Sequence, residues 1–178
     1  MPGTFAIRHA NRSDAEALSI FAAEQFRATY QDDTPASDLK SHIQKTFSTE
    51  CQQAEIDDPS AALFLATAND QIIGYAHVLL GMVDAHTALL NRIYIHAHWK
   101  GCGVAKNLLE KVVRESRQRG AQRLELTVFD RNARAIAFYM KSGFAAVGST
   151  TFPVGEDLQT DIVMEFALAE TIEEESTR

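Results

Sequence analysis

The sequence predicts a single α/β domain, and three observations lead to this fold class. The chain has 178 residues, of which 46% are hydrophobic, and this suits one domain with a full core. Short apolar runs typical of strands lie between longer segments that have the periodicity of amphipathic helices. In chain order these segments predict β-α-α-β-β-β-α-β-α-β-β, a mixture of strands and helices over residues 1–169.

The first third of the chain predicts one strand followed by helices. After a strand over residues 4–8, the pattern Ser13-Asp14-Ala15-Glu16 resembles a capping box and predicts the start of a helix. The apolar residues that follow recur on one helical face: Leu18, Phe21, Ala22 and Phe26. A loop over 31–35 separates this helix from a second one over 36–47, and a short third turn is expected over 50–56.

The remaining two thirds alternate between strands and helices. Residues 61–67 and 71–80 flank Asn69-Asp70 and predict a β-hairpin, and residues 88–95 predict the next strand. A glycine turn at 101 opens a long helix that ends before Gly120. The last expected elements are a strand over 123–129, a helix over 132–142, and strands over 144–151 and 161–168.

Composition excludes several classes of protein. The formal net charge of −7, part of it from an acidic tail over 170–178 that we expect to be disordered, argues against nucleic acid as the main partner. No apolar run approaches the roughly 20 residues of a membrane span, and the N-terminal pattern predicts no signal peptide. Cys51 and Cys102 do not form a disulfide framework, so we expect a cytoplasmic protein.

The segment from Asn91 to Lys106 predicts an anion-binding site. A strand runs into a glycine turn, and this turn opens a helix. Glycines let the backbone approach a ligand closely, and the first turn of a helix offers unpaired N–H groups. Such a helix start fits a pyrophosphate, although a glycine turn that binds no ligand would give the same pattern.

Spacing separates three known uses of this design. The P-loop pattern is missing, and Lys106 occupies the last position of a Rossmann glycine motif. The stretch Lys100-Gly-Cys-Gly-Val-Ala105 instead resembles the Arg/Gln-x-x-Gly-x-Gly/Ala loop of the GNAT superfamily of N-acyltransferases, with Lys100 replacing the usual Arg or Gln. Farther on, the segment from Asn132 to Phe144 is similar to the Asn-x-x-Ala-x-x-Phe-Tyr-x-Lys-x-Gly-Phe signature of that family. Because both motifs match, we favour the family resemblance over the alternative that Phe138-Tyr139-Met140 is an ordinary aromatic stripe of the core.

The resemblance implies a fold, a cosubstrate and a site. The fold would be a mixed, mostly antiparallel sheet of six to seven strands flanked by helices. The enzyme would use acetyl-CoA, and no metal, to acetylate a small-molecule amine, with Tyr139 protonating the leaving thiolate. The cofactor-binding set that it implies is Ile93, Tyr94, Ile95, Lys100, Gly101, Cys102, Gly103, Val104, Ala105, Lys106, Asn132, Ala135, Phe138, Tyr139 and Lys141.

A narrower resemblance covers roughly residues 5–167. Phe26-Arg-Ala-Thr-Tyr30, the 39–52 helices, Arg92–Ile95 and Glu156–Ile162 together are similar to bacterial polyamine (spermidine/spermine) N-acetyltransferases. That group usually has a carboxylate where this chain has Asn91, which leaves His96 and Glu125 as candidate bases. Peptide N-termini, amino sugars and a catalytically silent acyl-CoA-binding module remain as alternatives, and the resemblance allows a homodimer.

Cys102 needs no chemical role, and the nearby histidines predict no metal site. No base flanks Cys102 to activate it, so we interpret it as a small residue that fills the turn. His96 and His98 have no third ligand at suitable spacing, so the sequence predicts no metal site.

Overall fold

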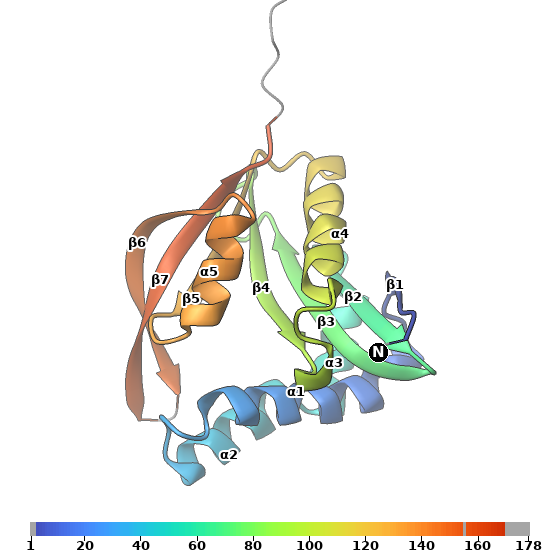
Figure 1. Ribbon diagram of the computed structural model, residues 1–178, viewed down its shortest axis with the longest axis vertical. Helices are drawn as coiled ribbons and strands as arrows, with labels where there is room; N and C mark the ends of the chain where they lie inside the picture. Colours follow the sequence, from blue (N-terminus) through green and yellow to red (C-terminus); the bar gives the residue numbers. More distant parts are fainter. Residues whose placement is uncertain (1–2, 155, 170–178) are drawn as a thin grey trace, which may run out of the picture.

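A seven-stranded sheet organises the computed structural model, which describes residues 3–154 and 156–169 (Figure 1). The strand order is β1-β2-β3-β4-β5-β7-β6, and only β4 and β5 pair in parallel. The strands are β1 Ala6–His9, β2 Ala61–Ala68, β3 Gln71–Leu80, β4 Thr87–Ile95, β5 Arg123–Phe129, β6 Ala145–Val154 and β7 Asp157–Ala167. The helices are α1 Ala15–Tyr30, α2 Ala36–Thr46, α3 Thr49–Asp57, α4 Val104–Gln118 and α5 Ala133–Lys141. The mixed, mostly antiparallel sheet expected from the sequence is confirmed.

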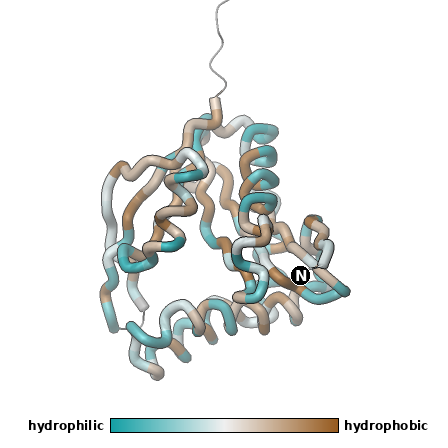
Figure 2. Tube along the Cα trace, in the orientation of Figure 1, coloured by the Kyte–Doolittle hydropathy of each residue, from teal (hydrophilic) through white to brown (hydrophobic). Residues whose placement is uncertain are grey.

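Two hydrophobic clusters lie on opposite faces of the sheet, because side chains alternate along each strand. On β2, Phe64 and Ala66 join the cluster that packs against α4, whereas Leu63 and Leu65 join the cluster formed with α1 and α2. Figure 1 shows α4 beside β2–β4 and α5 beside β5–β7, with α1 and α2 crossing the lower end of this view. Figure 2 shows apolar residues along the central strands and hydrophilic residues on the outer side of α4.

A β-bulge in β4 sets which side chains face the site. His77 of β3 lies opposite Arg92, but the next residue, Val78, lies opposite Leu90, so Asn91 is the extra residue. One inserted residue reverses the alternation of side chains along the strand. Leu90 and Ile93 therefore contact the same cluster, while Tyr94 contacts the opposite one.

Two expected helix starts differ in the structure. Asn11, not Ser13, forms the capping box, with Asp14 as its acidic partner, and a 3₁₀ turn over Arg12–Asp14 precedes α1. Asp14 also pairs with Arg8 of β1 at 2.8 Å, which fixes the earlier start. The short third turn is a complete helix, α3, because Ser48 accepts a hydrogen bond from the Cys51 N–H at 3.2 Å.

The last two strands extend beyond their expected limits. β6 and β7 form a long antiparallel pair in which Val154 lies opposite Asp157. The acidic tail predicted over 170–178 lies outside the described residues. Within the described ranges, no helix combines the length and apolar character needed to cross a membrane.

Candidate active site

The main cavity opens where β4 and β5 separate. Their parallel pairing ends at Leu90 opposite Leu126, and in the described part of the chain no strand pairs with this edge of β4 beyond that point. A cavity of about 1320 Å³ lies here, lined by β4, the loop that follows it, α4 and α5. The backbone N–H and C=O groups of 93–95 that point away from β3 are thus available to a ligand that would lie in the gap like an added strand.

The loop after β4 ends in an uncapped helix start at this cavity. Gly101 and Gly103 have φ values of +82° and +85°, in the left-handed region that favours glycine. Gly103 is the N-cap of α4, and no side chain among the described residues caps this helix. The first N–H groups of α4 have no partners within the helix, so this end of the cavity suits an anion.

Most of the charged side chains that line the cavity are basic, although the protein has a net charge of −7. The acidic residues that line it are Asp33 and Glu110. Asp33 is already paired with Arg131 at 3.1 Å. The basic residues are Lys100, Lys106, Arg114, Arg117, Arg131, Arg134 and Lys141. This local excess of positive charge favours a ligand that carries several negative charges.

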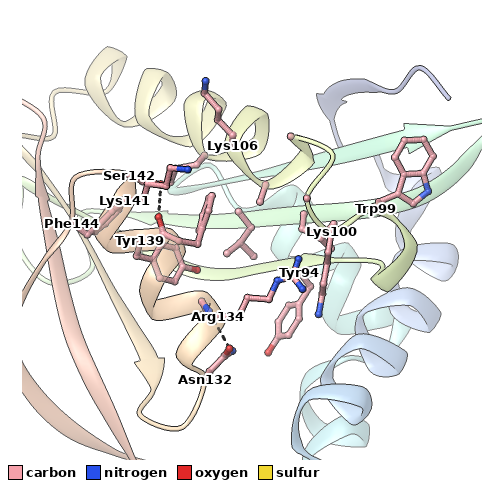
Figure 3. Close-up of a pocket in the computed structure, with 18 of the residues that line it drawn as sticks. Tyr94, Trp99, Lys100, Lys106, Asn132, Arg134, Tyr139, Lys141, Ser142 and Phe144 are labelled. Carbon is pink, nitrogen blue, oxygen red and sulfur yellow. Dashed lines mark hydrogen bonds between the residues drawn. The ribbon is translucent and has the colours of Figure 1, made fainter. Parts of the chain in front are cut away.

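Helix α5 supplies Asn132 and Tyr139 to the cavity. Asn132 is the N-cap of α5, and its Oδ1 accepts a hydrogen bond from the Ala135 N–H at 3.2 Å. Tyr139 is 7% exposed, and burial raises the pKa of its phenol, so the hydroxyl keeps its proton at neutral pH. Figure 3 shows Tyr139 on α5 and Tyr94 on β4 at opposite sides of the gap.

Most of the cofactor-binding set expected from the sequence lines this cavity. The two exceptions are Cys102 and Val104. Val104 is fully buried in the core beneath α4, and the Cys102 thiol lies 3.8 Å from the Lys100 carbonyl oxygen. Both are neighbours of the turn glycines, so only their backbone remains relevant to a ligand.

A second, smaller cavity of about 200 Å³ joins the first near Tyr94, Asn132 and Tyr139, which line both. Its walls are largely aromatic, and its ionisable groups include His42, Arg92 and Asp161. The aromatic residues that line it are Phe26, Tyr30, Phe47, Tyr94, Phe129, Tyr139 and Phe152. An amine that enters here would therefore meet ring faces and one carboxylate.

The positive charge in the smaller cavity is partly compensated by a residue of α3. The Arg92 guanidinium forms an ion pair with Glu55 of α3 and lies over the ring of Phe47, 5.1 Å from its centroid. His42 stacks on Phe26 at 4.6 Å, and burial together with the charge of Arg92 lowers the pKa of its imidazole. Asp161 is 5% exposed, and burial raises the pKa of its carboxyl.

The candidate bases from the sequence lie elsewhere. Neither His96 nor Glu125 lines either cavity, whereas Asn91 lines the smaller one. Glu125 faces Glu165 across the β5–β7 pair, and the His96 ring packs against that of His98 at 5.0 Å. In the described residues, no three His, Cys, Asp or Glu side chains form a group suited to a metal ion.

Asp161 and His42 line the smaller cavity but are not among the residues expected from the sequence. Asp161 lies in β7, which also contains Asp157 and Glu165, so no local pattern in the sequence distinguishes it. His42 lies in α2, far along the chain from the two glycine motifs, and no local pattern marks it.

Comparison with known proteins identifies the family. Residues 22–144 match the Acetyltransferase (GNAT) family. An uncharacterized N-acetyltransferase of Mycobacterium tuberculosis (strain ATCC 25618 / H37Rv) is 30% identical over 152 residues, covering 85% of this chain and 96% of that protein. An uncharacterized N-acetyltransferase from Lactobacillus delbrueckii subsp. lactis is 24% identical over 173 residues, covering 94% and 99% of the two chains.

Solved structures share the fold. The PaiA N-acetyltransferase of Thermoplasma acidophilum, in complex with coenzyme A, superposes with a TM-score of 0.79 at 23% identity, covering 93% of this chain and 99% of that chain. A GCN5-related N-acetyltransferase from Rhodopseudomonas palustris gives a TM-score of 0.74 at 19% identity, covering 93% and 96%. The chain therefore belongs to the GNAT family and is an acetyl-CoA-dependent N-acetyltransferase.

Proposed function

We propose that this enzyme acetylates a small cationic primary amine of the polyamine class, with the cosubstrate in the large cavity and the amine in the small one. The observation that carries the proposal is the smaller cavity, whose lining combines aromatic rings with the buried carboxylate of Asp161. Aromatic faces attract organic cations, and a carboxylate accepts hydrogen bonds from an ammonium group.

The residues of the large cavity fit acetyl-CoA, which supplies the acetyl group as a thioester. Its diphosphate and 3′-phosphate are anionic, and this cavity combines an excess of basic side chains with an uncapped helix start. A Cβ at Gly101 would meet no atom within 4 Å, and one at Gly103 would meet only Asn107 Nδ2 at 3.7 Å. The turn therefore leaves open space against its backbone, into which a phosphate group would fit.

The free edge of β4 would hold the pantetheine arm. In this proposal the backbone of Ile93 to Ile95 pairs with the amides of the arm, and one N–H polarises the thioester carbonyl. Asn132 would contact the same arm from α5. A rigid strand edge suits this role because its donors are already oriented before the substrate binds.

Tyr139 would act as the general acid. Its phenol is buried and protonated, and it lines both cavities, at the place where the sulfur and the amine would meet. Donation of this proton to the thiolate would prevent the reverse reaction from competing. A catalytically silent module would have no use for this hydroxyl.

The acceptor must lose a proton before it attacks. A primary alkylamine has a pKa near that of lysine, so roughly one molecule in a thousand is free base near neutral pH, at a cost of about 4 kcal/mol. Asn91 carries no charge and stands where the polyamine enzymes usually have a carboxylate. Free amine drawn from solution, or proton transfer through water in the smaller cavity, would then limit turnover at low pH.

A panel of amines tests the proposal. Release of free thiol from acetyl-CoA is measured with spermidine, spermine, an N-terminal peptide and an aminoglycoside as acceptors. We expect kcat/KM to be highest for spermidine or spermine, because the aromatic cavity suits alkyl cations better than sugar hydroxyls. Turnover confined to the peptide or the aminoglycoside would refute the polyamine class and leave the family assignment intact.

A further inference from the structure

The carboxylate of Asp161 is buried beside the acceptor cavity without a complete set of partners. Asp161 is 5% exposed, and among the described residues its Oδ1 has no hydrogen-bond partner. It lies in β7 directly opposite Phe129 of β5, so both side chains project from the same face of the sheet toward the smaller cavity. Buried polar groups normally have hydrogen-bond partners, so this oxygen is available to accept a hydrogen bond from a ligand.

The cations around Asp161 do not supply that partner. Arg92, which lines the same cavity, is engaged by Glu55 of α3. His42 of α2 is kept neutral near pH 7 because its environment lowers its pKa. The other charged group that acts on Asp161 is the exposed Asp130, whose negative charge disfavours a second anion nearby. A positively charged ligand would therefore offset the free-energy cost of burying the Asp161 carboxylate.

We infer that Asp161 binds an ammonium group of the acceptor other than the amine that attacks the thioester, and that it makes the smaller cavity selective for cationic amines. The carboxylate accepts N–H hydrogen bonds from the ammonium, while Tyr30 and Phe129 present their rings to the adjoining methylene groups. This role makes Asp161 a substrate-binding residue on β7, and it rests on the proposed function.

The charge contrast between the two cavities supports this assignment. Most of the charged residues that line the large cavity are Lys or Arg, which suits the phosphates of the cosubstrate. The carboxylate of Asp161, whose Oδ1 has no hydrogen-bond partner among the described residues, repels those phosphates and attracts an amine. Each substrate is thus directed to its own side of Tyr139, which lines both cavities.

The substitution Asp161→Asn tests the inference, because it preserves shape and removes the charge. With saturating acetyl-CoA and varied spermidine, we expect the KM for spermidine to rise by about 10- to 100-fold, the effect of losing a charge-assisted hydrogen bond. The KM for acetyl-CoA should stay within about twofold, since Asp161 lines only the smaller cavity.

Asp130→Asn is the matched control. This substitution removes the same charge from the residue next to Phe129. Asp130 lines neither cavity, so the KM for spermidine should change by less than about twofold. An unchanged KM in Asp161→Asn overturns the inference, as does an equal effect of both substitutions, which would indicate a general field instead of a direct contact.

A binding measurement covers the case in which Asp161→Asn folds poorly. Calorimetric titration of spermidine into the coenzyme A-saturated protein is then made with Asp161→Ser, whose melting temperature confirms folding. A loss of affinity of about tenfold or more supports the inference, and unchanged affinity overturns it. If the parent enzyme acetylates no cationic alkylamine, the proposed function fails together with this inference. If the parent is active and Asp161→Asn behaves like it, only the inference fails.

Discussion

The imidazole of His77 lies against the side-chain amide of Asn91, with 3.1 Å between His77 Nδ1 and the amide, at the bulge between β3 and β4. With the amide oxygen turned toward them, Asn91 Oδ1 accepts hydrogen bonds from His77 Nδ1 at 3.1 Å and from Arg92 Nη2 and Nε at 3.3 Å. Burial and the charge of Arg92 lower the pKa of His77 to about 3. At the bulge, His77 and Asn91 are therefore both uncharged near neutral pH, beside the charged Arg92.

The buried His77 predicts a loss of stability in mild acid. Its folded-state pKa lies below the value of 6.5 in the unfolded chain, so the unfolded state binds the extra proton as the pH falls below about 6.5. Between pH 7 and pH 5 this single group should cost about 2 kcal/mol of unfolding free energy. Urea unfolding at the two pH values, on the parent and on His77→Gln, measures the difference.

The comparison of the parent with His77→Gln isolates the contribution of this one group. His77→Gln should lose about 2 kcal/mol of the pH dependence. His42, whose pKa is also lowered, contributes equally to both proteins. Parallel curves for the parent and His77→Gln would show that the His77 imidazole is protonated in the folded state.

The ion pair between Glu55 and Arg92 predicts a second stability effect. The two side chains are 22% and 11% exposed, and Arg92 depends on Glu55 for compensation of its charge. Glu55→Gln should cost about 2 kcal/mol, which lowers the melting temperature by about 4–8 °C in a chain of this length. Asp57→Asn, on the same helix, breaks an exposed pair with Arg12 and should shift the melting temperature far less. Equal shifts would show that Arg92 is compensated by other groups.

Much of the fold could be predicted from the sequence because its signals are local. Helix α5 was expected over 132–142, and in the structure it spans Ala133–Lys141 with Asn132 as its N-cap. The capping box expected at Ser13 lies instead at Asn11, two residues earlier, because two capping patterns overlap there. Only the contact between Asp14 and Arg8 of β1 decides between them, and this contact depends on tertiary structure.

The candidate site also contains residues that the sequence predicts and residues that only the tertiary structure brings in. The glycine turn and the α5 residues were predicted because each lies within one continuous motif. Asp161 reaches the cavity because β7 inserts between β5 and β6 in the sheet, and His42 reaches it from α2. Neither position has a fixed spacing from the motifs, so a single sequence contains no pattern that brings them together.

Two glycines at opposite ends of α4 allow a controlled test of the anion site. Gly103 and Gly120 have φ values of +85° and +86°, so alanine at either position should cost about 1 kcal/mol of stability through the same backbone strain. Of these two glycines, only Gly103 lines the large cavity. Gly103→Ala should weaken coenzyme A binding roughly tenfold, and Gly120→Ala should leave it unchanged. Calorimetry that gives equal affinities for the two variants would place the phosphates away from this turn.

The phenol of Tyr139 gives the most direct test of the chemistry. Tyr139→Phe keeps the ring that packs against Phe138 and Phe144 at 5.3 and 5.5 Å, so folding and coenzyme A affinity should change little. Loss of a general acid should lower turnover by about 10²–10⁴-fold, while the KM for acetyl-CoA stays close to that of the parent. Thiol release at saturating substrates measures the effect. Tyr75→Phe is the control, because Tyr75 is fully buried and lines neither cavity, so its loss of a hydroxyl should leave turnover intact. If Tyr139→Phe keeps turnover within about twofold of the parent, the thiolate takes its proton from water and Tyr139 serves only to pack α5 against the sheet.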